Sequence, residues 1–158
     1  MTIDTTTSKR LATWTFAQWS VLVISLVHVV WSIIGWIAEP SFATGPGAPT
    51  TPVLGMDYNG WHAVAGLALF LPGLVFATRR SWAVLYCFVA GVAGGLPGVW
   101  ALFSNQVAYI FTFPNNELDA IEHFVTAAIL IGIGLIQVRR DGGLKQALAG
   151  LGPRFPAR

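Results

Sequence analysis

The sequence predicts an all-α, polytopic membrane protein with four transmembrane helices, arranged as two repeated helical hairpins with both termini in the cytoplasm. Three observations lead to this fold class. The 158 residues are 54% hydrophobic and 10% charged, with a mean hydropathy of +0.64, whereas soluble domains carry about 25% charged residues. Four apolar runs are close to the length that crosses a bilayer, about 20 helical residues. The basic residues all fall on one side of the resulting topology.

The first segment, residues 1–10, is polar and rich in threonine, and we expect a disordered cytoplasmic lead. The transmembrane domain covers residues 11–140, and its first span covers 11–37. This run exceeds the apolar region of a secretory signal, about 7–15 residues, which favours a retained helix. Its polar residues share one helix face, which we expect to turn toward other helices. They are Gln18, Ser25, His28 and Ser32.

Residues 39–58 contain four prolines with glycines between them, a composition typical of a loop without regular structure. A connection of about 20 residues is either a docking surface or a linker, and we interpret this one as a linker. The second span, 60–78, begins after Asn59 and contains Pro72-Gly73. Because proline removes a helix hydrogen bond, we expect the second helix to be broken late.

The third span, 82–103, is rich in glycine at two overlapping G-x-x-x-G spacings, which let helix backbones approach closely. The glycines are Gly91, Gly94, Gly95 and Gly98. Packing within the bundle is the simpler interpretation, and dimerisation through this face is the alternative. Cys87 is the single cysteine, so no disulfide can form within the chain and we interpret it as a packing residue.

The fourth span, 119–138, leads into a basic tail, 141–158, which we expect to be mostly unstructured apart from a short turn over 144–148. Four spans place every basic residue on one side of the membrane. These residues are Lys9, Arg10, Arg79, Arg80, Arg139, Arg140, Lys145, Arg154 and Arg158. The positive-inside rule then places both termini in the cytoplasm. This pattern indicates a multi-pass protein of a bacterial plasma membrane.

Three histidines lie within the predicted spans. In this orientation His62 and His123 each lie roughly 6 Å inside the outer face, and His28 lies about 13 Å inside it. Ionisable residues in a span are candidates for function, so we expect one outward-facing pocket with Asn59, Asp119 and Glu122 at its rim. The structural interpretation is a polar cluster that caps and bridges the second and fourth helices. Its members are Asn59, His62, Asp119, Glu122 and His123.

Cofactor binding is the alternative, more specific interpretation of the same residues. A metal ion would use His62, His123 and Glu122, with Asp119 or His28 added, and a haem would use His62 and His123. A proton relay would run through Glu122, His123 and His28. Glu122 and His123 are adjacent, so on a helix they point about 100° apart and do not readily share one ion. We therefore expect no cofactor.

The chain shows no nucleophile with an adjacent base, no phosphate-binding loop and no nucleic-acid signature. We therefore expect a non-catalytic protein in contact with the lipid bilayer, an accessory or scaffold subunit that associates with a larger membrane complex or with itself. The alternative is a haem- or metal-binding membrane protein for redox chemistry or transport, using His28, His62 and His123.

Two short motifs carry a resemblance to a known family. The run Asn59-Gly60-Trp61-His62 and the pair Asp119-x-x-x-His123 resemble the starts of the second and fourth spans in a four-helix membrane family common in actinobacteria. This family is named domain of unknown function 4383. The resemblance covers roughly residues 13–140, although Ala120 stands where the family usually has asparagine. It implies a four-helix membrane fold and no known activity.

Overall fold

The computed structural model describes residues 13–104, 106–107, 111–112 and 116–152. The predicted lead over residues 1–10 and the end of the predicted tail lie outside these residues. The described elements run in chain order as α1 (Phe16–Ala38), β1 (Thr51–Val53), β2 (Met56–Tyr58), α2 (Gly60–Phe76), α3 (Arg80–Ala101), β3 (Gln106–Val107), β4 (Phe111–Thr112), α4 (Glu117–Arg140), α5 (Leu144–Ala147) and the 3₁₀ turn η1 (Ala149–Leu151).

Helices form at all four predicted apolar runs. Three of them, α1, α3 and α4, are long and apolar enough to cross a membrane, while α2 is apolar but has only 17 residues. At 1.5 Å per residue α2 is about 26 Å long, slightly less than the ~30 Å hydrocarbon core. The first helix begins at Phe16 and not at residue 11, because Thr15 caps it in a reciprocal capping box with Gln18.

The expected break in the second helix is wrong. Helix α2 continues through Pro72 to Phe76. One turn before this proline, the Tyr86 hydroxyl from α3 donates a hydrogen bond of 2.9 Å to the Leu69 carbonyl. A neighbouring helix thus supplies a donor to the backbone close to where proline disturbs the helix bonding.

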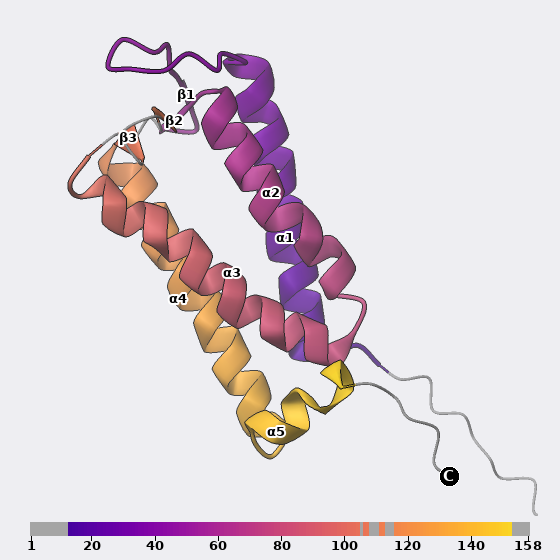
Figure 1. Ribbon diagram of the computed structural model, residues 1–158. Helices are drawn as coiled ribbons and strands as arrows, with labels where there is room; N and C mark the ends of the chain where they lie inside the picture. The colour runs from indigo at the N-terminus through magenta and orange to yellow at the C-terminus, as the bar shows by residue number, and fades with distance from the viewer. Residues whose placement is uncertain (1–12, 105, 108–110, 113–115, 153–158) are drawn as a thin grey trace, which may run out of the picture.

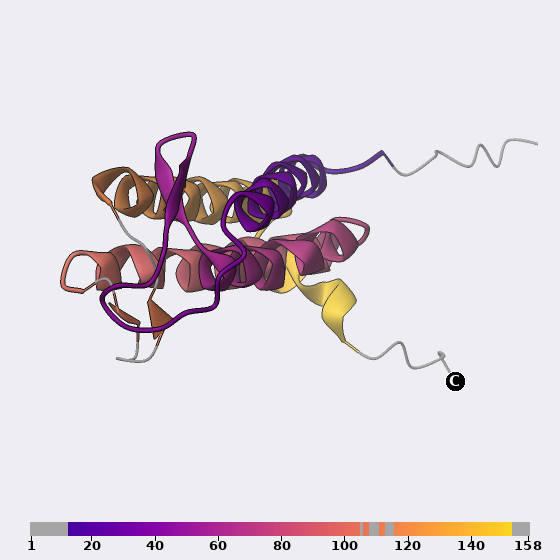
Figure 2. The same cartoon turned by 90° about the horizontal axis from the view of Figure 1, so that it is seen from above.

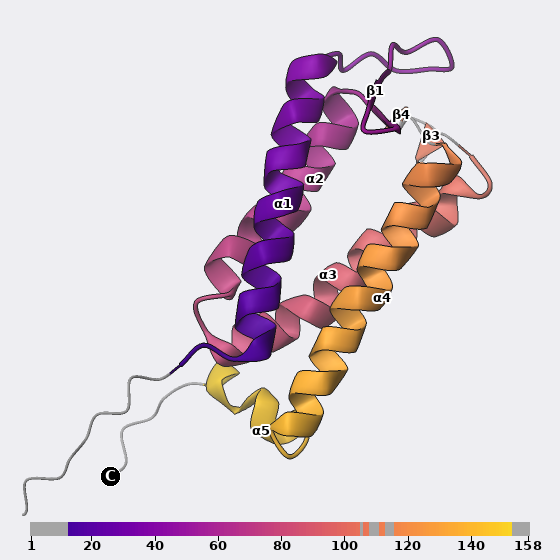
Figure 3. The ribbon, with the colours of Figure 1, turned by 180° about the vertical axis from the view of Figure 1, so that it is seen from behind.

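The helices pair as two hairpins, with α1 packed along α2 and α3 packed along α4. Figures 1 and 3 show the hairpins converging near the α2–α3 turn and separating toward the β-strands. Glycines let α1 and α2 approach closely, because Gly66 faces Ser32 and Gly73 faces Ser25. Both serines are at most 2% exposed, so this part of the predicted polar face does turn toward a neighbouring helix.

The glycines of α3 pack mainly against α4 of the same chain. A Cβ atom placed on Gly98 would lie 2.8 Å from the His123 Cβ, and one on Gly95 would lie 3.2 Å from the Ala127 Cβ. Gly91 faces the same helix, whereas Gly94 faces Leu69 of α2. The glycine face is therefore covered within one chain.

The long loop after α1 contains regular structure, so its interpretation as a plain linker is wrong for residues 51–58. Strands β1 and β2 pair antiparallel with Thr51 opposite Tyr58. Leu54 and Gly55 both have positive φ, 53° and 88°, as a tight two-residue hairpin turn requires. We name this hairpin, residues 51–58, the strap. Figure 2 shows it reaching across the ends of the helices.

The segment between α3 and α4 also contains a short hairpin. Strand β3 pairs antiparallel with β4, with Gln106 opposite Thr112 and Val107 opposite Phe111.

The tail after α4 is ordered over residues 141–152, which contradicts the expectation of a mostly unstructured tail there. The expected turn near residues 144–148 is present as α5, and η1 follows it. Ala147 is 1% exposed, and the Gly150 amide donates a 3.0 Å hydrogen bond to the Ser81 hydroxyl. The tail thus folds back onto the start of α3. Both ends of the described chain lie at this end of the bundle (Figure 1).

Candidate functional site

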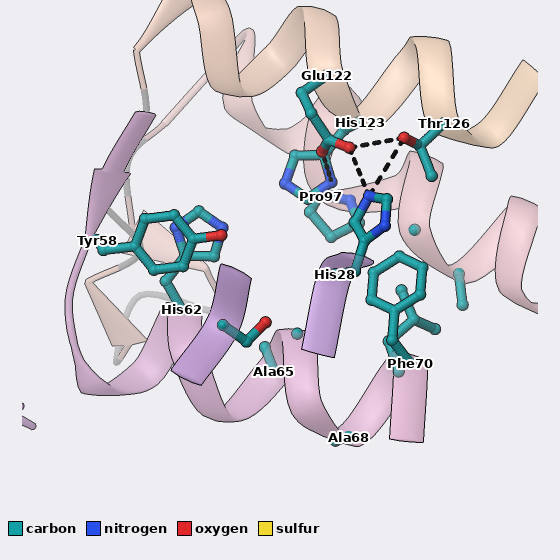
Figure 4. A pocket seen from close by; sticks show the side chains of 15 residues that line it. His28, Tyr58, His62, Ala65, Ala68, Phe70, Pro97, Glu122, His123 and Thr126 are labelled. Atoms are coloured by element: carbon teal, nitrogen blue, oxygen red, sulfur yellow. Dashed lines mark hydrogen bonds and ion pairs between the residues drawn. The ribbon is translucent and has the colours of Figure 1, made fainter. Parts of the chain in front are cut away.

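A cavity of about 430 Å³ lies between the two helical hairpins (Figure 4). This volume falls within the usual range for small-molecule sites, roughly 300–1,000 Å³. Helices α1 to α4 and the strap all contribute to its wall. The apolar lining is Ala65, Gly66, Ala68, Leu69, Phe70, Ala93, Gly94 and Pro97. The polar lining is His28, Ser32, Tyr58, His62, Glu122, His123 and Thr126.

His28 is held at both ring nitrogens. Its Nδ1 lies 2.7 Å from the Ile24 carbonyl one turn earlier in α1, and its Nε2 lies 2.9 Å from Glu122 Oε1. The ring of Phe70 stacks on the imidazole with centroids 4.0 Å apart. The pair His28–Glu122 therefore joins α1 to α4 across the cavity.

The protonation of this pair follows from its hydrogen bonds. A carbonyl only accepts, so Nδ1 of His28 carries a proton and donates it to Ile24. The short contact from Nε2 to Glu122 Oε1 then requires one more proton between these two atoms. Thr126 donates to the same oxygen at 2.6 Å. Whether the shared proton belongs to imidazolium or to carboxylic acid, the pair has no net charge.

His62 is positioned by the start of α2 and by the strap. Asn59 caps the helix, with its side-chain oxygen accepting from the His62 amide at 3.0 Å. The Nδ1 of His62 donates to the Asp57 carbonyl at 2.8 Å. The Tyr58 ring stacks on the imidazole at 4.3 Å with planes 5° apart. Asn59 is fully buried and positions His62, but it does not line the cavity.

His123 lies beside His62 across the cavity mouth. Their ring centroids are 6.1 Å apart and their planes differ by 23°. His123 Nδ1 is 4.0 Å from Glu122 Oε2. Ring nitrogens direct their lone pairs in the ring plane, so two stacked rings do not aim nitrogens at one shared iron or metal. Within the described part of the chain, no three His, Cys, Asp or Glu side chains form a metal-binding group.

Asp119 has a different place from the one expected. The cap of α4 is Asn116, and Asp119 is the third helical residue, reciprocally bonded to that cap. Its Oδ2 also accepts from the Asp57 amide at 3.1 Å. Asn116 donates to the Gly55 carbonyl at 2.8 Å. Asp119 therefore ties the strap to α4 and does not line the cavity.

Tyr58 and Thr126 are the polar lining residues that the sequence did not single out. Thr126 lies four residues after Glu122 on a helix, a spacing that brings side chains together. Tyr58 sits in the segment interpreted as a linker, where no periodic pattern marks it. Its ring covers Gly35 of α1, and Figure 4 shows its hydroxyl pointing into the cavity. Burial, followed by the charges of Glu122 and Asp119, raises the pKa of Tyr58, so the hydroxyl stays protonated.

The resulting arrangement can hold a small molecule. An apolar wall of small side chains faces a neutral proton-sharing pair, two further imidazoles and a phenol. Cys87 is fully buried in the helix core and does not line the cavity.

Comparisons with known proteins place the chain in a family. The profile of the domain of unknown function named DUF4383 matches residues 18–136, from the first turn of α1 to the last turns of α4. This range includes every residue that lines the cavity. No curated protein and no solved structure matches the chain. The chain belongs to the DUF4383 family.

Proposed function

We propose that the chain is a non-catalytic integral membrane protein that holds a small molecule in the cavity between its two hairpins. The observation that carries this proposal is the convergence of three histidines and Glu122 from three helices on one cavity of about 430 Å³. Ionisable groups within membrane helices are costly, and they usually mark a binding site or a pathway.

Four spans with cytoplasmic termini in a bacterial plasma membrane form part of the proposal. The outward faces of α1, α3 and α4 carry large exposed apolar side chains such as Val27, Leu96 and Ile129, which suit lipid. Arg79, Arg80, Arg139 and Arg140 gather at one end of the bundle. The positive-inside rule supports a cytoplasmic position for that end. Helix α2, although short, packs alongside α1 for its whole length.

The role that fits this site is that of an accessory subunit. A ligand between the hairpins would contact both, so its presence would favour one spacing of α1–α2 relative to α3–α4. Such a change can be passed to a larger membrane complex or to a second copy of the chain. His28, His62 and Glu122 of the wall are bonded to one another or to backbone, which supports binding over catalysis.

A haem- or metal-binding protein for redox chemistry or transport is the second candidate. The observation that favours it is the presence of His28, His62 and His123 on one cavity wall. The visible absorption spectrum and the metal content of the purified protein decide between the two candidates. A colourless, metal-free protein that still carries an organic ligand supports the first.

Native mass spectrometry of protein purified in mild detergent tests the first proposal. We expect a co-purifying small molecule and either a dimer or a complex with a partner subunit. Ala65→Leu places a larger side chain in the cavity and should displace the small molecule. Ala128→Leu makes the same change on an exposed position of α4 and should retain it. An identical ligand load in both variants contradicts the cavity as the binding site, and a lone monomer contradicts the accessory role.

Cysteine labelling tests the orientation separately. In a Cys87→Ala background, Gly47→Cys marks the loop before the strap and Lys145→Cys marks α5, both at exposed positions. An impermeant maleimide should label residue 47 in intact cells and residue 145 only after permeabilisation. The reverse pattern contradicts cytoplasmic termini.

A further inference from the structure

The chemistry of the cavity wall narrows the class of ligand, given the proposed function on which this step rests. We propose that the cavity binds an uncharged, largely apolar molecule carrying one carbonyl or hydroxyl oxygen, which accepts a hydrogen bond from the Tyr58 hydroxyl. Three properties of the wall lead to this class: its charge balance, its apolar surface and its one available phenol.

The charge balance disfavours ions. His28 and Glu122 share one proton and have no net charge together, and their contact is closed by Thr126 and the Ile24 carbonyl. Both side chains are mostly buried, 16% and 21% exposed. A bound anion or cation would have to break this pair or remain uncompensated between apolar helices, and both alternatives are unfavourable. An uncharged ligand leaves the pair intact.

The apolar surface sets the body of the ligand. The α2 and α3 walls present small side chains, Ala65, Ala68 and Ala93 among them, and Phe70 closes the deep side behind His28. This surface offers contacts to a hydrophobic body of drug-like size and few hydrogen-bonding groups. A molecule of this kind also partitions into lipid, from which it can reach a cavity between membrane helices.

The Tyr58 hydroxyl is the group that favours a ligand with an acceptor oxygen. It makes no hydrogen bond to another residue in the described part of the chain, and it points into the cavity from the strap (Figure 4). Burial keeps it protonated by raising the pKa of Tyr58, so it acts as a donor. The ring itself is fixed by stacking on His62 and by its contact with Gly35. A fixed donor favours a ligand with an acceptor oxygen at that place.

A matched series of naphthalene probes tests the inference at pH 7. The probes are naphthalene, 1-naphthol, 1-naphthoate and 1-naphthylmethylammonium, which share one body and differ in head and charge. Each is partitioned between nanodiscs that contain the full-length protein and empty nanodiscs. We expect saturable binding of 1-naphthol at one per chain, about three- to tenfold weaker binding of naphthalene, and weaker binding still of both ions.

Three substitutions test the Tyr58 hydroxyl and the cavity separately. Tyr58→Phe keeps the ring and should reduce the affinity for 1-naphthol to that for naphthalene, with naphthalene itself unchanged. Tyr86→Phe removes the hydroxyl of a residue that does not line the cavity and that donates to the Leu69 backbone carbonyl, and it should change neither affinity. Ala65→Leu should abolish the binding of both.

The outcomes distinguish the ligand class from the proposed function. If either ion binds as tightly as 1-naphthol or more tightly, or if Tyr58→Phe has no effect, the ligand class is overturned. In that case, probe binding that is lost in Ala65→Leu still supports the cavity as a binding site. Absence of saturable binding for every probe also overturns the ligand class. In that case the native-mass comparison of Ala65→Leu with Ala128→Leu decides separately whether the cavity binds a molecule at all.

Discussion

The two ends of the helix bundle join the hairpins in different ways. At the basic end, near Arg79 and Arg139, the hairpins touch directly: the Ala17 amide donates to Gln137 Oε1 at 3.3 Å, and the Arg140 guanidinium lies 4.9 Å from the centre of the Phe16 ring. At the histidine end, near His62 and His123, they are joined through side chains around a cavity and through the strap.

The difference shows which end of the bundle is adjustable. Close contacts between the hairpins at the basic end involve the backbone of Ala17 and the side chain of Gln137, which are 0% and 3% exposed, and packed cores resist deformation. At the histidine end the spacing of the hairpins depends on one proton-sharing pair and one hairpin loop. A ligand can therefore alter the spacing there at a lower cost in free energy than at the basic end.

Glu122→Leu, at the histidine end, should have the largest effect on the free energy of unfolding. It leaves His28 Nε2 without its hydrogen-bonding partner, and we expect a loss of about 3 kcal/mol in the free energy of unfolding, the lower end for breaking a buried pair. Glu122→Gln should retain most of the stability, because its amide can donate to a neutral His28 Nε2. Titration with SDS in mixed micelles measures these values.

A double-mutant cycle supplies the control for that result. His28→Leu, Glu122→Leu and the double variant should give a coupling energy of about 1.5–3 kcal/mol, as for hydrogen bonds to charged groups. A second cycle combines Gln137→Leu at the basic end with Glu122→Leu. These two sites are distant, so their effects on the free energy of unfolding should be additive. A coupling near zero for His28 with Glu122 contradicts a histidine end joined by this pair.

The helices and the inward histidines could be predicted from the sequence, because both depend on local pattern. Apolar runs mark helices, and the positions of His28, His62 and His123 follow once the spans are in place. Helix ends were less accurate: α4 begins at Glu117 because Asn116, not Asp119, is its cap. A cap is chosen by contacts with the rest of the fold, here with Gly55.

The strap could not be predicted, because contacts distant in sequence hold it. Its strands have three residues each, one of them a proline, so no alternation of apolar and polar residues identifies them. The Asp57 amide bonds to Asp119, 62 residues away, and Tyr58 covers Gly35. The inward position of Tyr58, and with it the hydroxyl in the cavity, follows from these contacts.

Gly35→Ala should have the next largest effect on the free energy of unfolding, because the added Cβ displaces the strap. A Cβ atom there would enter the Tyr58 ring, 2.6 Å from Cγ, and the ring cannot move without lifting the strap. We expect a loss of about 1–3 kcal/mol, as for overpacking, and weaker ligand binding. Gly132→Ala is the matched control, since nothing lies within 4 Å of its Cβ. It should be neutral or stabilising by up to about 1 kcal/mol. Equal effects of the two substitutions contradict a strap fixed by Tyr58.

Asp141→Asn at the basic end should have the smallest effect. Burial acts to raise the pKa of Asp141, but hydrogen bonds from Arg80 and Gln137 outweigh it and lower that pKa below its ordinary value. A carboxylate with a depressed pKa in the folded state stabilises the fold above its unfolded pKa of about 3.9 and loses that contribution as the pH falls through the folded value. Since Arg80 is 56% exposed, the difference between wild type and variant should be under about 1 kcal/mol at pH 7 and should disappear as the pH falls through the lowered pKa of Asp141 in the folded state. We expect acidification to weaken the basic end only slightly, because neither the Ala17–Gln137 hydrogen bond nor the Phe16–Arg140 contact involves a carboxylate. Unfolding measured at a series of pH values from 7 downward tests this. A difference that persists at low pH contradicts the assignment of this stability to the charge of Asp141.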